Sequence, residues 1–367
     1  MNRSSAKALG LSVALGFGVL LGGGIEARAQ GPSPNVHHFA GGLNNPRGLK
    51  FGPDGNLYVA EGGAGGTTST VGQCEQVIGP VGPYSGGLTA RISKIDGSGN
   101  RTTVVDNLPS SQTSANLGSL VSGVADVAFI GNTLYGLLAG AGCSHGLAGT
   151  TNGIIRVNSN GTWTLVADLS AFQKAHPVAN PEPDDFEPDG TWYSMVAVRG
   201  KLYAIEPNHG ELDVITTDGQ IRRIVDISAT QGHIVPTSVA YHGNFYVGNL
   251  HLFPITPGSS KVLKITPSGE VKTVATGFTT VLGVAFDHEG YLYVLENTTV
   301  SGFPTPFTGK VLRVTDDGVE EIASGLFLPT AMTFGPDGAL YVSNVGFGPP
   351  PVGLGEVVRI TVPPVAD

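Results

Sequence analysis

One pattern of apolar and polar positions recurs along the chain: an apolar stretch, a short polar turn, a second apolar stretch and a polar end. The clearest copies lie at residues 47–61, 282–297 and 330–344. Three looser copies lie between them, at residues 125–138, 194–206 and 237–249. Apolar residues alternate within each copy, and turns such as Pro-Asp-Gly and His-Gly-Asn favour tight hairpins. Six copies of a β-hairpin predict a repeat architecture.

Two further strands are expected after most hairpins. They lie at residues 91–95 and 101–105, 153–157 and 163–167, 211–215 and 221–225, 261–265 and 271–275, and 310–314 and 319–323. The sixth hairpin is followed by only one strand, at residues 356–361, while residues 36–40 resemble a spare fourth strand. The pattern therefore predicts an all-β, six-bladed β-propeller of four-stranded antiparallel blades, closed by an N-terminal strand that completes the last blade.

Composition supports many short strands, because the 367 residues include 55 Gly and 25 Pro and only 13% are charged. Residues 1–29 have a basic start, an apolar run of small residues and an Ala-Arg-Ala end, which predicts a signal peptide. A membrane anchor is the alternative, but glycines interrupt the run and it is short for a span. We expect residues 30–367 to form one soluble propeller domain without a membrane span, in an extracytoplasmic (secreted or periplasmic) location. The net charge of −9 argues against nucleic acid as a partner.

Topology sorts the loops of a propeller onto two faces. The turns between strands 1 and 2 and between strands 3 and 4 are short. The long connections are residues 62–90, 139–152, 170–191, 250–260, 298–309 and 345–355, and all should lie on the other face, here called the loop face. Long loops on a rigid scaffold are where binding and catalysis are usually found.

Polar residues end the second strand of most blades on this face. In blade order the positions are Glu61, Leu138, Glu206, Asn249, Glu296 and Asn344. Three carboxylates that converge on the channel mouth need a positive partner. Calcium or another divalent cation, held by Glu and Asn oxygens, is one possibility. A solvated polar rim, or an ion pair between a glutamate and Arg47, is the alternative.

Histidines and acidic residues also gather on the loop face. His145, His209, His233 and His251 could form, with Glu206, a metal site or an acid–base pair, or they could simply be hydrogen-bonded loop residues. The stretch 180–193 carries four acidic residues among prolines and aromatics; they are Asp184, Asp185, Glu187 and Asp189. It could be a cation-binding loop or a stiff acidic lid.

Cys74 and Cys143 are the only cysteines, and both are expected in loops of adjacent blades on the same face. In an exported chain this favours a disulfide over thiol chemistry.

Several segments resemble one known family. They are residues 187–194, 202–203, 235–239, 246–249, 253–254, 292–296 and 328–344. Across nearly the whole mature chain the sequence is similar to the ScyD/ScyE family of exported propeller proteins. The resemblance implies an NHL-like or SMP-30-like six-bladed propeller, and the family implies no established reaction.

Metal-dependent gluconolactonases of the wider superfamily take ligands from the starts of the inner strands. The corresponding positions here are Arg47, Ala125, Ser194, Thr237, Leu282 and Thr330, and none is a carboxylate. This argues against a lactonase of that type.

The expected function is therefore an exported binding or scaffold protein that engages a small molecule, polysaccharide or protein on its loop face. Candidate binding residues are Arg47, Asn249, Asn344, Asp184, Asp185 and Glu187. The alternative is a metal-assisted hydrolase or lyase at the channel mouth, with candidate catalytic residues Glu206, His209, His233, His251 and Glu296.

Overall fold

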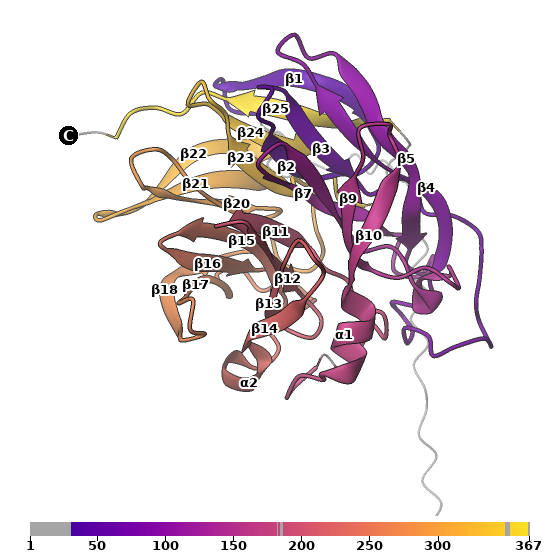
Figure 1. The fold of residues 1–367 in the computed structure, drawn as a ribbon. Coiled ribbons are helices and arrows are strands. Elements are labelled where there is room, and N and C mark those ends of the chain that lie inside the picture. Colours follow the sequence, from indigo (N-terminus) through magenta and orange to yellow (C-terminus); the bar gives the residue numbers. More distant parts are fainter. Residues whose placement is uncertain (1–30, 182, 184–185, 349–352, 366–367) are drawn as a thin grey trace, which may run out of the picture.

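The computed structural model of the chain describes residues 31–181, 183, 186–348 and 353–365. Its strands form six antiparallel sheets, which follow one another along the chain as the blades of a propeller (Figure 1). The predicted six-bladed β-propeller is confirmed. The predicted signal peptide, residues 1–29, lies outside the described residues.

The first three blades contain these strands. Blade 1 has β2 (Pro46–Phe51), β3 (Leu57–Glu61), β4 (Ser85–Ile95), β5 (Arg101–Gln112) and the short β6 (Val121–Ser122). Blade 2 has β7 (Val124–Ile130), β8 (Thr133–Leu138), β9 (Gly153–Val157) and β10 (Trp163–Asp168). Blade 3 has β11 (Ser194–Val198), β12 (Lys201–Glu206), β13 (Glu211–Ile215) and β14 (Ile221–Asp226).

The last three blades complete the ring. Blade 4 has β15 (Pro236–His242), β16 (Asn244–Asn249), β17 (Ser260–Ile265) and β18 (Val271–Phe278). Blade 5 has β19 (Val281–Phe286), β20 (Leu292–Glu296), β21 (Gly309–Thr315) and β22 (Gly318–Leu326). Blade 6 has β23 (Ala331–Phe334), β24 (Leu340–Asn344), β25 (Gly355–Ile360) and, from the other end of the chain, β1 (Val36–Leu43).

The pairing of β1 joins the two ends of the described chain in one sheet. β1 runs antiparallel to β25, with Val36 opposite Ile360 and Leu43 opposite Gly355, and Figure 1 shows the indigo strand beside the yellow one. The innermost strands contact one another in ring order, β2, β7, β11, β15, β19 and β23, and β23 contacts β2 again. A closed ring leaves no inner strand edge open to a further chain.

Apolar side chains fill the spaces between neighbouring blades. Each of six apolar clusters joins two adjacent blades; one example combines Ile92 of blade 1 with Leu138 of blade 2. This distribution follows from the strand pattern, because alternate residues of a strand face opposite sides of its blade. The core is thus six layers arranged around an axis.

Two local features depart from the sequence prediction. In blade 1, β4 begins earlier than expected and β5 ends later, because Ser85–Gly87 pair with residues 110–112. The loop expected at residues 170–191 contains the helix α1 (Leu169–Ala175), whose Asp168 side chain accepts the Ala171 N–H as an N-cap. Within the described ranges, the other helical segments are α2 (Ser228–Gln231) and one 3-10 turn (Cys143–His145). No described helix is long and apolar enough to span a membrane.

Candidate functional site

The glutamates that end the second strands each bond to the backbone of the segment that precedes the first strand of the same blade. Glu61 accepts the N–H of Asn44 at 2.6 Å, Glu206 that of Thr191 at 2.9 Å, and Glu296 that of Thr279 at 2.5 Å. Each donor lies in the segment that leads into the first strand of that blade. The side chain therefore satisfies a backbone group that would otherwise be buried without a partner.

The two asparagines at the equivalent positions do the same. Asn249 accepts the Lys261 N–H at 2.8 Å and donates to the Ile234 carbonyl at 2.8 Å. Asn344 accepts the Phe327 N–H at 2.9 Å. Each polar end is thus bonded to backbone groups of its own blade, and a cation shared between them stays a prediction from the sequence. Among the described residues, no group of three or more His, Cys, Asp or Glu side chains is placed to hold a metal ion.

The positive partner of Glu61 is Arg91, not Arg47. Arg91 stands opposite Glu61 in the sheet, and its Nε lies 2.7 Å from the Glu61 carboxylate. Arg47 instead donates to the Val121 carbonyl at 2.5 Å. Its guanidinium lies 5.8 Å from the ring centre of Tyr193 and 6.0 Å from that of Phe347. Arg47 is buried in this position, where cation–π contacts stabilise it on the loop-face side of the inner strands.

The environment of Glu296 changes the protonation of its carboxyl. Burial raises the pKa of its carboxyl to about 7, although the Thr279 N–H and the Lys310 charge oppose the shift. At neutral pH it is therefore close to half protonated.

Glu187 anchors a buried polar network. Its carboxylate accepts the Tyr84 hydroxyl at 2.6 Å and lies 3.2 Å from His145 Nε2. His145 Nδ1 lies 2.8 Å from the Ser111 hydroxyl, and the Glu187 carbonyl lies 3.1 Å from His209 Nε2. Ser111, His145 and Glu187 resemble a catalytic triad by composition, but all three are buried, so a substrate cannot reach the Ser111 hydroxyl.

Asp189 extends this network toward blade 2. It accepts the Ser144 N–H and hydroxyl, each at 2.7 Å, and the Lys174 ammonium at 2.5 Å. Burial raises the pKa of its carboxyl, but the bonds from Lys174 and Ser144 outweigh this and hold the pKa below its usual value. Asp184 and Asp185 lie outside the described residues.

The histidines separate into two groups. His145 and His209 both contact Glu187, whereas His233 and His251 lie in the loops before and after the first hairpin of blade 4. The pKa of His233 is lowered to about 4, first by burial and then by the charges of His209 and His251. Burial and the Lys261 charge lower the pKa of His251. These two imidazoles are therefore neutral at pH 7.

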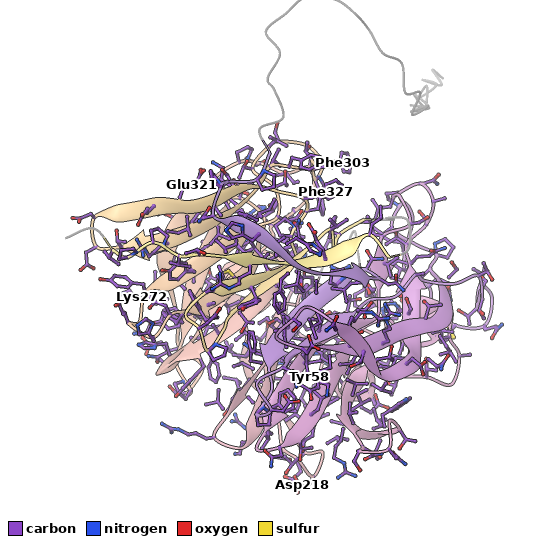
Figure 2. All side chains as sticks on the ribbon, turned by 90° about the horizontal axis from the view of Figure 1, so that it is seen from above. Tyr58, Asp218, Lys272, Phe303, Glu321 and Phe327 are labelled. Carbon is purple, nitrogen blue, oxygen red and sulfur yellow. A yellow bond between two sulfur atoms is a disulfide. The ribbon has the colours of Figure 1, made fainter. Side chains whose placement is uncertain are left out.

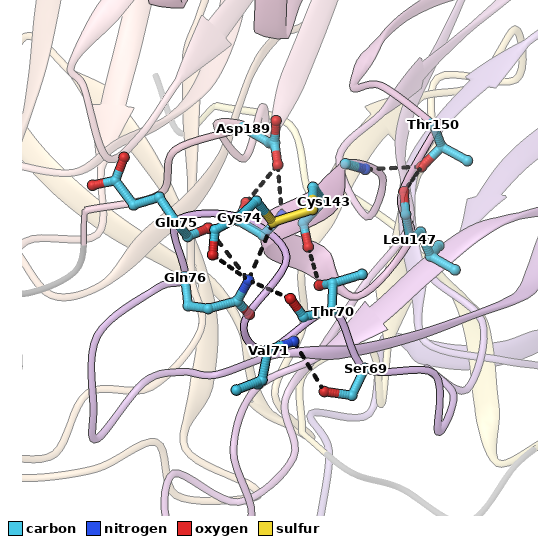
Figure 3. The surroundings of a disulfide bond; sticks show 12 residues. Ser69, Thr70, Val71, Cys74, Glu75, Gln76, Cys143, Leu147, Thr150 and Asp189 are labelled. Atoms are coloured by element: carbon cyan, nitrogen blue, oxygen red, sulfur yellow. Dashed lines mark hydrogen bonds between the residues drawn. A yellow bond between two sulfur atoms is a disulfide. The ribbon is translucent and has the colours of Figure 1, made fainter.

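The predicted disulfide is confirmed. Cys74 and Cys143 are bonded, with 6.3 Å between their Cα atoms, and they tie the long loop of blade 1 to that of blade 2 (Figure 3). The Thr70 hydroxyl donates to the Cys143 carbonyl beside the bond. A disulfide of this kind is typical of proteins outside the cytoplasm.

Three buried carboxyls were missed by the sequence analysis. Asp126 lines the central channel because a β-bulge between Val124 and Asp126 shifts the register. One carboxylate therefore does face the axis, one residue after Ala125. Glu211 and Asp213 lie on β13 inside blade 3. The Glu-x-Asp spacing of Glu211 and Asp213 on one strand could have signalled a shared face, but the burial of that face depends on the neighbouring blade.

The central channel is too small for a substrate. Its cavity measures about 30 Å³ and is lined by inner-strand residues such as Gly48, Asp126 and Ser238, which leaves room for about two water molecules. Burial raises the pKa of Asp126 to about 6, although the Lys50 charge and the N–H groups of Met195 and Val127 oppose the shift. A ligand larger than a few water molecules therefore needs a site outside this cavity.

Solved structures similar to this chain are propellers of low sequence identity. A Bacteroides thetaiotaomicron protein of unknown function has a TM-score of 0.57 and 12% identity, over 90% of this chain and 76% of its own. A candidate oxidoreductase (glucose dehydrogenase) from Thermus thermophilus has a TM-score of 0.54 and 19% identity, over 89% and 99%. A gluconolactonase from Xanthomonas campestris has a TM-score of 0.52 and 12% identity, over 89% of both chains. At such identities the similarity shows the fold alone.

No protein-family model and no curated protein matches the chain. The similarity to the ScyD/ScyE family therefore stays a prediction from the sequence.

Proposed function

We propose that this chain is an exported binding protein that holds its ligand on the loop face. The observation that carries the proposal is the exposure of aromatic side chains there, with 43% of Phe253, 66% of Phe303 and 48% of Phe307 accessible. Exposed aromatic groups on a rigid scaffold commonly mark binding surfaces. Export is supported by the predicted signal peptide and by the disulfide.

The state of the polar candidates also favours binding over catalysis. Glu206 and Glu296 are buried and bonded to backbone N–H groups, and His209 is buried against the Glu187 carbonyl. A catalytic side chain must reach the atoms of its substrate. In these positions the three side chains stabilise the loops instead.

The proposal can be tested by a ligand screen followed by footprinting. The purified mature chain is screened by thermal unfolding against soluble polysaccharides, small aromatic compounds and proteins. A hit that saturates at one site is then examined by hydroxyl-radical footprinting and recovered for mass analysis. We expect protection on the loop face and an unchanged ligand. Protection confined to the short turns, or conversion of the ligand, would contradict the proposal.

A second candidate function, a hydrolase or lyase, is favoured by one observation. His233 and His251 are neutral at pH 7 and near each other, and neither is fully buried. A neutral imidazole is a competent general base. If the footprinting hit is converted to product, His233→Gln and His251→Gln should each abolish turnover without abolishing binding. Retained turnover in both variants would remove these residues from the reaction.

A further inference from the structure

Two long loops of neighbouring blades are locked together on the loop face. The loop after β16 and the loop after β20 meet at Ile255 and Gly302, which exchange both backbone hydrogen bonds, at 2.8 and 3.0 Å. A reciprocal pair of this kind fixes the two loops in one register. The flanking residues are therefore held at defined positions relative to each other.

The bridge places two exposed phenyl rings in near-parallel orientation. Phe303 follows Gly302 directly, and Phe253 lies two residues before Ile255. Their ring centres are 6.1 Å apart and their planes differ by 18°. Phe307, on the same loop, packs edge-on against Phe327 at 4.9 Å. We call Phe253, Phe303 and Phe307 the aromatic shelf, and Figure 2 shows Phe303 on the opposite side of the molecule from the short-turn residue Asp218.

Threonine hydroxyls hold the blade 5 part of the shelf in place. Thr298 and Thr308 bond through their hydroxyls at 2.6 Å, and the Thr308 hydroxyl also lies 2.7 Å from the Thr305 carbonyl. The Thr305 hydroxyl donates to the Phe303 carbonyl at 3.2 Å. A loop that is ordered before it binds loses less conformational entropy on binding.

The shelf is uncharged in an otherwise acidic protein. The chain carries a net charge of −9, yet residues 252–260 and 297–309 contain no Asp, Glu, Lys, Arg or His. Hydroxyl-bearing residues surround the rings instead, with Thr256, Ser301 and Thr305 exposed. Charged ligands are usually held by opposite charges, so this composition fits a ligand that is neutral and rich in hydroxyl groups.

We propose that the aromatic shelf binds a neutral polysaccharide, whose sugar rings stack on the exposed phenyl rings. The C–H faces of a pyranose are apolar and weakly positive, and they complement the negative face of a phenyl ring. The rings are exposed on a surface, so each contact buries little area, and a polymer gains affinity by making several such contacts. This inference rests on the proposed function and names the ligand class for the same face.

The test measures binding to defined polymers by affinity electrophoresis and calorimetry. The probes are dextran, mixed-linkage β-glucan and galactomannan, with alginate as an anionic comparison. The variants are Phe253→Ala, Phe303→Ala and their double combination. Trp163→Ala is the matched control, because Trp163 is an exposed aromatic residue beside a short turn. Phe303→Trp keeps an aromatic ring and checks that loss of binding reflects loss of stacking.

We expect at least one neutral polymer to bind, and each alanine variant to weaken it about tenfold, the effect of one lost ring contact. Trp163→Ala and Phe303→Trp should bind as the unchanged chain does, and all variants should keep its unfolding temperature. Binding that survives the double variant, or a preference for alginate, would overturn the inference. Failure of all three neutral polymers would overturn it as well. If the ligand screen then finds an aromatic compound or a protein on the loop face, only the polysaccharide assignment fails and the binding function stands.

Discussion

Glu296→Gln should make the protein more stable above neutral pH and leave it unchanged in acid. The buried carboxyl has a pKa of about 7 in the folded chain against 4.5 in the unfolded chain, with burial as the main cause. A raised folded pKa means that the folded state holds its proton more tightly. The stability that this contributes is complete below pH 4.5 and is lost as the pH rises through about 7.

The magnitude follows from the shift. Each pKa unit corresponds to about 1.4 kcal/mol, so ionisation of Glu296 costs the folded state about 3 kcal/mol at full deprotonation. Glutamine cannot ionise, and its side-chain oxygen can still accept the Thr279 N–H. The variant should therefore exceed the unchanged chain in free energy of unfolding by about 3 kcal/mol near pH 9, and by almost nothing near pH 4.

The assay is urea unfolding at about five pH values between 4 and 9, with Glu270→Gln as control. Glu270 is an exposed turn residue, so its substitution should not change the pH dependence. A stability difference between Glu296→Gln and the unchanged chain that is the same at every pH would refute the argument, because it would show that the effect is not one of ionisation. A variant less stable than the unchanged chain near pH 9 would do so too.

Three further predictions concern other parts of the fold. Replacing Cys74 and Cys143 by serine should lower the free energy of unfolding by about 4 kcal/mol in the chain-entropy model, given their separation of 69 residues; equal urea midpoints with and without the bond would contradict this. Asp213→Asn should stabilise the protein at neutral pH but not near pH 4, because burial and the Glu211 charge raise the pKa of Asp213 well above its usual value; thermal unfolding at both pH values checks it. Gly48→Ala should cost about 1–3 kcal/mol, since a Cβ there would overlap the Asp126 carboxylate and lie 2.7 Å from its Cα; an unchanged unfolding temperature would show that the inner strands can separate.

The fold was predictable because its signals are local. Each hairpin can be found in the sequence from alternating apolar and polar residues and a turn between them. One such turn is Pro53-Asp54-Gly55, where Gly55 has a φ of 77°. Six such units leave few topologies other than a propeller. The pairing of Cys74 with Cys143 was equally accessible, because only two cysteines exist and both fall in adjacent loops.

The candidate site was less predictable, because sequence position does not fix the direction of a side chain. The alignment of the repeats placed Glu61, Glu206 and Glu296 correctly at the ends of their strands. Each side chain, however, points to the backbone that precedes the first strand of its own blade. The partner of Glu61 could be found only from the register that sets Arg91 opposite it. The bulge that exposes Asp126 to the channel has no sequence signature of its own.

The loops of blades 1 to 3 and those of blades 4 and 5 are held in different ways, and this difference supports the proposed place of binding. In blades 1 to 3, the disulfide joins two loops, and the Glu187 and Asp189 carboxylates bury their charges among Tyr84, His145 and Lys174. Polar groups that already bond to one another cannot also bind a ligand without leaving their present partners unpaired. In blades 4 and 5, backbone and threonine bonds supply the rigidity, so the rings of the aromatic shelf remain available. A ligand that stacks there disturbs none of the bonds that hold the loops, which is why we place recognition on this half of the face.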